Sequence, residues 1–206
     1  MIELPTKRLS EQTSLAKALE KRSSCRYFKE ESLTLQDLSN LLWAAQGITD
    51  KAYKLRRTVP SAGAVYPIEM YVAVRENGVH ELDKGVYRYV AENHGLEKIS
   101  ESDIKENLSK ACYNQEFITR ASFTIFLASN NQRIRELYNQ RGDSYAMMEA
   151  GAITQNISLE AVASNLGTVV IGAFDDEMVK SLFDIEKLIP LVIMPVGRPS
   201  DKKFYT

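Results

Sequence analysis

Two short stretches of the chain carry residue types that could do chemistry, and the first covers residues 22–28. Successive side chains of an extended segment point to opposite sides, so Arg22, Ser24 and Arg26 would project to one side. Two guanidinium groups and a hydroxyl arranged in this way are well suited to hold a phosphate group. The serines and the cysteine of this stretch disfavour a helix. A basic helix end that complements the helix dipole would also explain the two arginines.

The second stretch is a loop of small residues at positions 60–67. Pro60 and Pro67 fix the backbone at both ends and keep the preceding residues out of a helical conformation. Between them, Ser61, Ala62 and Gly63 carry almost no side-chain bulk. Such a loop lets a flat or large molecule approach its backbone closely. Composition alone equally fits an ordinary tight turn that leads into a strand.

The elements that must position these stretches are indicated by the spacing of apolar residues. Helices are predicted over residues 14–21, 35–46, 102–111 and 145–166, with short helices around residues 134–138 and after Asp175 or Asp176. Thr34 and Asp37 have the spacing of a capping box at the start of the second helix. Strands are predicted over residues 70–74, 85–90, 121–128 and 188–196, and residues 168–174 form a β-rich run broken by glycine.

The longest predicted helix carries a face of mostly small residues, namely Ala146, Ala150, Ile153, Ile157 and Ala161. Small side chains allow close packing, either inside the subunit or across a dimer axis. The apolar strand at residues 188–196 offers further surface that a second subunit could cover.

The overall composition limits the classes of function. A length of 206 residues is enough for one domain with a real core, so residues 1–206 are predicted to form a single domain. A net charge of -1 gives no electrostatic reason to bind nucleic acid or an anionic membrane. No apolar run is long enough to span a bilayer, and residues 1–14 lack the apolar core of a signal peptide.

The cysteines and histidines give no sign of a disulfide framework or a metal site. Cys25 and Cys112 are the only cysteines, which fits a reducing cytoplasm. His80 and His94 stand apart from other ligand types. The sequence therefore predicts no bound metal and a surface position for both histidines.

The sequence at 60–67, Pro-Ser-Ala-Gly-Ala-Val-Tyr-Pro, resembles the PSAGAxYP signature of the nitroreductase-like flavoproteins, in the branch that includes the SagB-type dehydrogenases. Residues 22–28 are similar to the RRSxRxF motif of that family, with Ser23 where the family has its second arginine. Residues 41–49 resemble the LLWAAQGIT of the SagB-type branch, and the likeness runs in the same order from residue 14 to residue 199. The resemblance implies an α+β fold, with a central, mainly antiparallel sheet flanked by helices, and a homodimer.

The resemblance also implies which residues would bind an FMN cofactor. Arg22, Ser24 and Arg26 would hold its phosphate and ribityl chain, and Arg198, after the last strand, would return to the phosphate. The loop residues that would lie against the isoalloxazine ring, from the partner subunit, are Pro60, Ser61, Ala62 and Gly63.

Two further segments are implied to meet the flavin ring. Asn114 or Gln115 would reach its polar edge, although two side-chain amides just past a helix also fit a simple helix cap. The backbone of Ile171, Gly172 and Ala173 would pass beside the reactive N5 atom.

No residue of the chain is expected to act as a catalyst by itself. The sequence has no Walker A motif, no G-x-G-x-x-G after a strand and no G-x-S-x-G elbow. FMN would carry the redox chemistry. The resemblance implies that NADH or NADPH gives hydride to the flavin and that a nitroaromatic, a quinone or a related small conjugated molecule accepts the electrons.

Two other functions stay open. SagB-type dehydrogenases oxidise peptide azolines and carry a Lys-Tyr pair, but here Leu137 stands before Tyr138 where the lysine would be. This departure argues against azoline oxidation. A module that binds FMN to sense or store it, without turnover, would show the same flavin-contact motifs.

Overall fold

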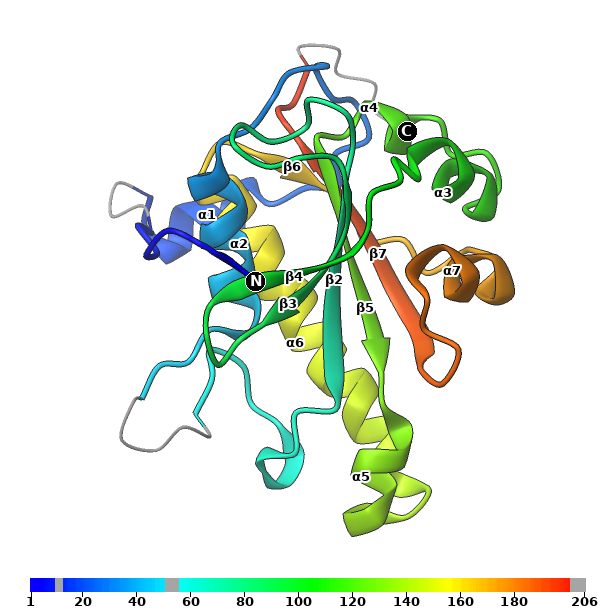
Figure 1. Cartoon of the computed structure of the whole chain (residues 1–206). Coiled ribbons are helices and arrows are strands. Elements are labelled where there is room, and N and C mark those ends of the chain that lie inside the picture. The colour runs from blue at the N-terminus through cyan, green and yellow to red at the C-terminus, as the bar shows by residue number, and fades with distance from the viewer. Residues whose placement is uncertain (10–12, 51–55, 201–206) are drawn as a thin grey trace.

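A computed structural model of the chain describes residues 1–9, 13–50 and 56–200. Its strands are β1 (Ile2–Glu3), β2 (Ile68–Val74), β3 (Gly85–Val90), β4 (Gly95–Ser100), β5 (Phe123–Ser129), β6 (Gly167–Thr168) and β7 (Ile189–Gly197). They form one seven-stranded sheet in the order β1-β4-β3-β2-β5-β7-β6 (Figure 1). Every pair of neighbouring strands is antiparallel.

Helices cover both faces of this sheet. They are α1 (Leu15–Lys21), α2 (Leu35–Gln46), α3 (Lys105–Ala111), α4 (Phe117–Arg120), α5 (Asn131–Tyr138), α6 (Arg141–Ala163) and α7 (Asp176–Phe183), together with a short 3-10 helix, η1 (Ala62–Ala64). The helices α1, α2 and α6 lie on one face, and α3 and α7 lie on the other (Figure 1). The predicted α+β fold with a central antiparallel sheet and flanking helices is confirmed.

Several helix boundaries follow directly from capping side chains. At the start of α2, the Thr34 hydroxyl accepts a hydrogen bond from the backbone N–H of Asp37, and the Asp37 carboxylate accepts one from the backbone N–H of Thr34. This is the predicted capping box. Asp175 caps α7 by accepting from the backbone N–H of Met178 at 2.9 Å. Each of these contacts satisfies a backbone donor that the first helical turn leaves free.

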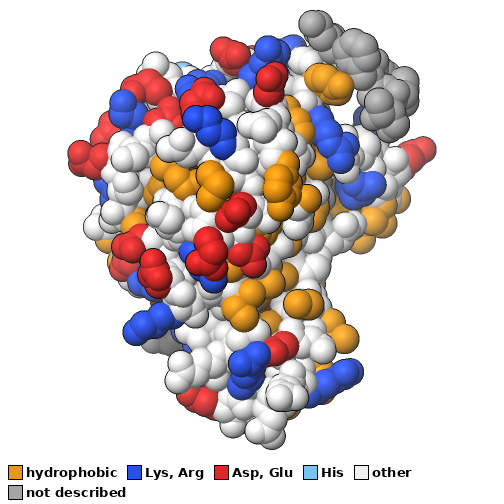
Figure 2. All heavy atoms as spheres, turned by 90° about the vertical axis from the view of Figure 1, so that its right-hand side faces the viewer, with side chains coloured by type: hydrophobic (Ala, Val, Ile, Leu, Met, Phe, Trp, Pro, Cys, Tyr) orange, Lys and Arg blue, Asp and Glu red, His pale blue; other side chains and the backbone are white. Residues whose placement is uncertain are grey.

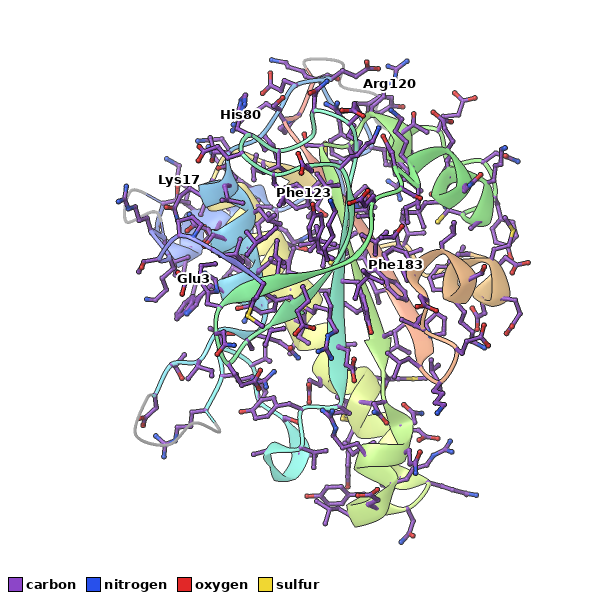
Figure 3. All side chains as sticks on the ribbon, viewed as in Figure 1. Glu3, Lys17, His80, Arg120, Phe123 and Phe183 are labelled. Atoms are coloured by element: carbon purple, nitrogen blue, oxygen red, sulfur yellow. The ribbon has the colours of Figure 1, made fainter. Side chains whose placement is uncertain are left out.

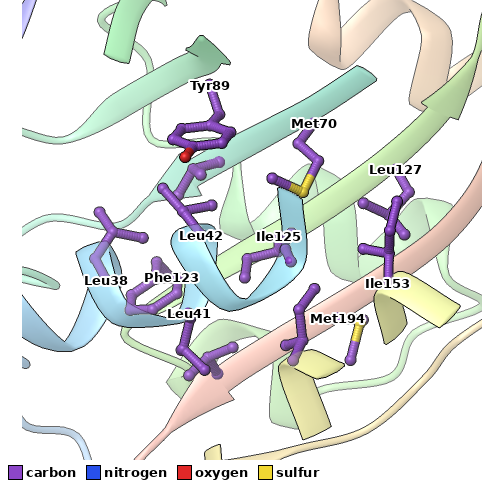
Figure 4. Close-up of a cluster of buried hydrophobic side chains, with 14 of the residues drawn as sticks. Leu38, Leu41, Leu42, Met70, Tyr89, Phe123, Ile125, Leu127, Ile153 and Met194 are labelled. Carbon is purple, nitrogen blue, oxygen red and sulfur yellow. The ribbon is translucent and has the colours of Figure 1, made fainter. Parts of the chain in front are cut away.

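The larger of two cores lies between the sheet and the helices α2 and α6. Side chains of a strand alternate between its two faces, and β5 directs Phe123, Ile125 and Leu127 toward these helices. There they pack with buried leucines of α2 and with Ile153 of α6 (Figure 4).

The smaller core lies on the opposite face, beneath α3 and α7. Phe126 of β5 points to this side and stacks on Phe183 of α7, with ring centroids 4.4 Å apart. Phe123 and Phe183 therefore lie on opposite sides of the sheet (Figure 3). Because β5 is buried on both faces, its sequence is a nearly continuous apolar run. Its predicted central position in the sheet is confirmed.

The structure differs from the sequence prediction at several elements. The helix expected from residue 102 begins at Lys105, because the Asp103 carboxylate accepts from the backbone N–H groups of Lys105 and Glu76 and holds a turn there. The β-rich run at 168–174 contributes only the end of β6 and one isolated bridge, from Ile171 to Ile193. Strand β4 and helix α4 were not predicted.

The face of small residues on α6 packs inside the chain. Ala146, Ala150, Ile153, Ile157 and Ala161 are all buried in the larger core. The strand at 188–196 is also internal, since β7 pairs with β5 on one side and with β6 on the other. Neither surface is free for a second subunit, and the expectation that they would supply one is wrong.

Candidate functional site

The segment predicted to hold a phosphate runs beside the end of β7. A bridge joins Phe28 to Pro199, and the backbone N–H of Lys29 donates to the carbonyl of Arg198 at 2.9 Å. These contacts place residues 22–28 next to Arg198, which is far away in the sequence. Both were predicted to bind the same phosphate group.

Three polar side chains of this segment have no polar partner in the described part of the chain. Arg22, Ser24 and Arg26 are exposed, and their side chains make no hydrogen bond or ion pair with any residue that the structure describes. The segment is non-helical after the cap of α1 at Arg22, as predicted. Two unpaired guanidinium groups on one short segment form an anion-binding feature.

Arg198, by contrast, is already paired. Its Nε donates to a carboxylate oxygen of Glu31 at 3.0 Å, and its Nη1 donates to the carbonyls of Ser164 and Asn165, each at 3.3 Å. These carbonyls follow the C-terminal end of α6, where a cation is favoured by the helix dipole. An anion at Arg198 would have to share this guanidinium with Glu31.

The two segments predicted to meet a flavin ring lie together on the side of the sheet that carries α3 and α7. The Tyr113 hydroxyl donates to the carbonyl of Phe174 at 3.4 Å, and the backbone N–H of Asp175 donates to the carbonyl of Ala111 at 2.8 Å. The stretch that leads to Asn114 is thereby tied to the stretch that follows Ala173. Hydrophobic side chains gather near the middle of this side (Figure 2).

Asn114 and Gln115 follow the end of α3 in different ways. Tyr113 and Asn114 both have left-handed backbone, with φ of 56° and 62°. The amide of Gln115 donates to the carbonyl of Cys112 at 3.0 Å, which is the helix cap that the sequence left as an alternative. The oxygen of this amide is not used in that contact.

The backbone around Gly172 is open. Ile171 exchanges two backbone hydrogen bonds with Ile193, each 2.9 Å long, whereas Gly172 and Ala173 are exposed. A Cβ atom added at Gly172 would meet nothing within 4 Å. The chain itself therefore gives no packing reason for a glycine at this position.

The 60–67 loop is tightly shaped by its own contacts. Gly63, Ala64 and Tyr66 have positive φ of 59°, 53° and 48°. A Cβ atom on Gly63 would lie 2.7 Å from the hydroxyl oxygen of Tyr138, so this glycine is required by a close approach as well as by its backbone. The Ser61 hydroxyl accepts from the backbone N–H of Tyr66 at 2.8 Å and closes the loop.

Tyr66 ties the loop to two arginines. The Arg133 side chain donates to the Tyr66 carbonyl at 3.0 Å, and the backbone N–H of Arg57 donates to the Tyr66 hydroxyl at 3.2 Å. The Arg57 guanidinium also lies 4.4 Å from the centre of the Tyr66 ring. The Arg57 guanidinium donates to the side-chain oxygen of Gln46 at 3.1 Å and to the carboxylate of Glu92 at 2.9 Å.

Glu149, a buried glutamate of α6, was not among the site residues predicted from the sequence. It is only 3% exposed, and its Oε1 lies 3.5 Å from the amide nitrogen of Gln46. Burial raises the pKa of Glu149 to about 7, while the Ser61 hydroxyl, the backbone of Ile68 and the charges of Arg57 and Arg133 oppose that rise. The signal in the sequence is a glutamate one turn from Ala146 and Ile153, on the face that was predicted to be buried.

Two of the three groups of predicted site residues lie at different points along α6. The 60–67 loop packs on Tyr138, just before the start of α6, and lies at the lower end of Figure 1. The 22–28 segment and Arg198 lie near β6, beyond the last turn of α6. Because Ser61 acts on the pKa of Glu149, eight residues into α6, the loop and the end of this helix are about 20 Å apart along its axis.

The described part of the chain offers no metal site, and one histidine prediction is wrong. No group of three or more His, Cys, Asp or Glu side chains is placed to hold a metal ion among residues 1–9, 13–50 and 56–200. The ring of His94 is half-buried and hydrogen-bonded to Ser39 at 2.8 Å and to Tyr89 at 2.9 Å, and burial lowers its pKa. His80 is exposed, as predicted.

Across the same described ranges, none of the helices combines the length and the apolar character needed to cross a lipid bilayer.

Comparisons with known proteins agree with this architecture. The protein MJ1384 of Methanocaldococcus jannaschii, which carries the name of a nitroreductase, is 40% identical over 188 residues that cover 91% of this chain and 92% of that protein. The microcin B17-processing protein McbC of Escherichia coli is 24% identical over 88% of this chain and 68% of its own length.

Solved structures give the same fold. A nitroreductase-like protein of Ralstonia eutropha superposes with a TM-score of 0.84 and 27% identity, over 98% of this chain and 90% of that one. A chain of the Escherichia coli microcin synthetase complex McbBCD has a TM-score of 0.78 at 23% identity, over 88% of this chain and 70% of its own, which shows a common fold. The model of the nitroreductase family matches residues 19–198. The chain therefore belongs to the nitroreductase family, and that membership supports an oxidoreductase.

Proposed function

We propose that this protein is an FMN-dependent oxidoreductase that passes hydride from NADH or NADPH to a nitroaromatic, a quinone or a related conjugated small molecule. Bound FMN would supply the redox chemistry. The protein's own residues would bind the cofactor, orient its ring and leave one face open to the two substrates in turn. We further propose that residues 1–206 form one FMN-binding domain.

The observation that carries this proposal is the free cationic segment beside β7. Arg22, Ser24 and Arg26 are exposed and unpaired within the described chain, and they fit a phosphate because guanidinium and hydroxyl groups donate to its oxygens. Arg198 fits less well, since Glu31 already occupies its Nε. The proposed phosphate site therefore rests mainly on Arg22 and Arg26, with Arg198 in support.

The open backbone at residues 171–173 fits the reactive part of a flavin ring. Gly172 and Ala173 are exposed, and a Cβ atom on Gly172 would meet nothing within 4 Å, whereas Ile171 is buried and its backbone is bonded to Ile193. Asn114 and Gln115 lie on the same side of the sheet and would reach the polar edge of the ring. A flat ring laid on this surface would explain why Gly172 needs no side chain.

The position of the 60–67 loop supports a site shared between two subunits. Pro60, Ser61, Ala62 and Gly63 stand on the α6 side of the sheet, where Ala62 packs against the larger core, whereas Ile171 lies in the smaller core on the opposite face. The loop and the proposed ring surface of one chain therefore lie on different sides of the sheet. A homodimer would bring this loop of the partner subunit to the ring, so we propose that each FMN site is built from two chains.

The outward face of α6 is the surface that we propose for the dimer contact. Met147 and Met148 are 62% and 63% exposed, and a Cβ atom on Gly151 would meet nothing within 4 Å. A glycine inside a helix costs about 1 kcal/mol relative to alanine, so an outside surface that approaches Gly151 closely would account for it.

Sedimentation tests the dimer. The wild-type protein should sediment as a yellow dimer, and Gly151→Glu, which places a charge on the outward face, should give a folded, colourless monomer. Ala150→Glu serves as a contrast, because it places the charge in the core and should unfold the chain. An FMN-saturated wild-type monomer at micromolar concentration would show that one chain closes the site.

The visible spectrum tests the function. The purified protein should be yellow, release FMN on denaturation and lose its visible flavin absorption when NADH or NADPH is added without oxygen. Addition of a quinone or nitroaromatic should restore the absorption. A protein that takes up no FMN contradicts the whole proposal, whereas a yellow protein that neither nucleotide reduces would be the non-catalytic flavin module.

Azoline oxidation is the second candidate, because one observation favours it. The Tyr138 hydroxyl lies directly against Gly63 of the proposed flavin loop, which is where a tyrosine could act near a flavin. Its neighbour Leu137 is 63% exposed, however, and cannot donate or accept a proton in place of lysine. We expect the isolated protein to leave azoline peptides unchanged, and turnover of such a peptide would reverse the choice.

A further inference from the structure

An acidic side chain, Glu31, is paired with one of the arginines of the proposed phosphate site. Its carboxylate accepts a hydrogen bond from Arg198 Nε at 3.0 Å. A phosphate oxygen would accept the same hydrogen bond from this guanidinium. Residues 22–28 lie beside Arg198 through the contacts of Phe28 and Lys29. The carboxylate of Glu31 therefore takes up a donor that the proposed function assigns to an anionic ligand.

The backbone of Glu31 is fixed to the central sheet. Its N–H donates to the carbonyl of Lys29 at 2.9 Å. Its carbonyl accepts from the Ser122 hydroxyl at 2.9 Å and from the Arg75 guanidinium at 3.0 Å. Arg75 directly follows β2 and Ser122 directly precedes β5. The pairing with Arg198 thus starts from an anchored backbone, and the carboxylate can leave Arg198 by a change of side-chain conformation alone.

The stability of the fold gives little reason for this ion pair. The side chains of Arg198 and Glu31 are 33% and 44% exposed, and an ion pair this exposed contributes little because water screens both charges. Nη1 of Arg198 is held independently by the carbonyls of Ser164 and Asn165, each at 3.3 Å. Arg198 would therefore keep its place without Glu31.

Glu31 takes half of the edge through which Arg198 could bind a phosphate. Nε and Nη2 lie on one edge of the planar guanidinium, and such an edge binds phosphate through two parallel hydrogen bonds. Nη2 has no hydrogen bond with any residue that the structure describes, whereas Nε donates to Glu31. Two-point binding of a phosphate at this edge requires the carboxylate to move away.

We propose that Glu31 sets the affinity of the phosphate site, because it competes with the FMN phosphate for Arg198. Arg22 and Arg26 bind the phosphate without such competition, since their side chains have no polar partner in the described chain. FMN is then held less tightly than three free arginines would allow, and it can exchange with the solution. The inference rests on the proposed function, because it assigns a phosphate-bearing cofactor to these residues.

The affinity for FMN of Glu31→Gln, measured by fluorescence titration at low ionic strength, tests the competition. The amide oxygen can still accept from Arg198 but carries no charge, so it competes less well. FMN should bind about ten-fold more tightly than to the wild type, the value of one charge-assisted hydrogen bond regained. Riboflavin should bind equally to both proteins, and the gain for FMN should shrink as salt is added. Unchanged or weaker binding of FMN would overturn the proposal.

Two further variants define the path of the effect. Glu30→Gln is the matched control, because the Glu30 carboxylate lies 3.7 Å from Arg120 and not at Arg198. It should keep wild-type affinity for FMN, and a gain equal to that of Glu31→Gln would trace the effect to net charge and contradict the competition. In an Arg198→Ala background, Glu31→Gln should change FMN affinity by less than about two-fold. A full gain in that background would show that Glu31 does not act through Arg198.

Inorganic phosphate separates this inference from the proposed function. A ligand that binds only the folded chain raises the midpoint of thermal unfolding. Without FMN and at constant ionic strength, rising phosphate should raise this midpoint more in Glu31→Gln than in the wild type or Glu30→Gln. If the wild type binds no FMN, the proposed function fails and this measurement still decides whether Glu31 competes for an anion. The same response to phosphate in all three proteins, including no response, would overturn the competition.

Discussion

The two ends of α6 (Arg141–Ala163) are built in opposite ways. Near its C-terminal end, Arg22 and Arg26 are exposed, and their side chains make no hydrogen bond or ion pair with the described chain. At its N-terminal end, the 60–67 loop is held by Tyr138 and by a buried polar group around Glu149. The first end offers exposed groups for binding, and at the second end most polar groups are engaged within the chain, although Glu149 Oε2 and Arg57 Nε have no partner in its described part.

The glycines show the same contrast. Gly63 is demanded by the chain itself, through a φ of 59° and a Tyr138 hydroxyl that leaves no room for a Cβ atom. At Gly172, by contrast, an added Cβ atom would meet no atom within 4 Å. The backbone and Tyr138 explain why residue 63 is a glycine. No contact within the described chain explains why residue 172 is a glycine, so Gly172 is the one that indicates an external ligand.

The largest effect is expected when the free charges are removed. Charge-assisted hydrogen bonds contribute about 1.5–3 kcal/mol each, so the double variant Arg22→Ala/Arg26→Ala should bind FMN about 100-fold more weakly or worse. Riboflavin, which lacks the phosphate, should bind it as it binds the wild type. Fluorescence titration with both flavins measures the ratio.

Lys17→Ala is the control for this experiment, since Lys17 is an exposed cation on α1 outside the segment. It should keep wild-type affinity for both flavins. Equal loss of FMN and riboflavin in the double arginine variant would mean that the segment supports the fold and holds no phosphate.

The second prediction concerns the buried end and its dependence on pH. The folded-state pKa of Glu149 lies near 7, above its ordinary value of 4.5. A carboxyl with a raised pKa contributes most to stability below its unfolded pKa, and the contribution is lost as the pH rises through the folded pKa. The full shift corresponds to about 3 kcal/mol. The free energy of unfolding of the wild type should therefore fall by about this amount between about pH 4.5 and pH 8, and that of Glu149→Gln should not.

Urea unfolding of the protein without FMN measures this difference. Glu136→Gln, which changes an exposed carboxylate of α5, should reproduce the wild-type pH profile. A wild type whose profile coincides with that of Glu149→Gln would place the Glu149 carboxyl in contact with water.

The third prediction addresses the strain in the loop. Gly63→Ala forces an alanine into left-handed backbone, which costs about 1–2 kcal/mol, and pushes its Cβ atom against the Tyr138 hydroxyl. Both FMN and riboflavin should bind more weakly, because the shape of the loop changes while the phosphate segment is untouched. Adding Tyr138→Phe should recover the part of the loss that comes from the clash. If Tyr138→Phe restores no flavin affinity, the whole loss in Gly63→Ala comes from the strained backbone.

Local sequence patterns predicted the elements whose causes are local. The capping box of Thr34 and Asp37 and the apolar run of β5 both depend on neighbours in sequence, and both are confirmed. The pairing of Arg198 with Glu31 joins residues 167 positions apart, so no local pattern could reveal that this arginine is engaged.

The burial of α6 shows a second limit of sequence reasoning. Small residues spaced along a helix indicate close packing but do not say against what, and Ala150 proved to face the sheet. Glu149 was visible as a charge on that buried face, yet its contact with Gln46 of α2 joins residues 103 positions apart. What the sequence could not supply is the set of long-range contacts that decide which groups remain free.

The smallest effect on stability is expected at Gly172, and it separates the two kinds of glycine most directly. Gly172→Ala adds a methyl group that meets no atom within 4 Å, so the free energy of unfolding without FMN should be unchanged or higher by about 0.4–1 kcal/mol, through a less flexible unfolded chain. If a flavin ring lies on this backbone, the same methyl group should weaken FMN and riboflavin equally, since the contact is to the ring and not to the phosphate. Calorimetry of the free protein and fluorescence titration with both flavins would measure the two quantities on one sample. A variant that gains stability and loses flavin would mark Gly172 as a glycine kept for a ligand, while full flavin affinity would mean that the ring does not lie over residues 171–173.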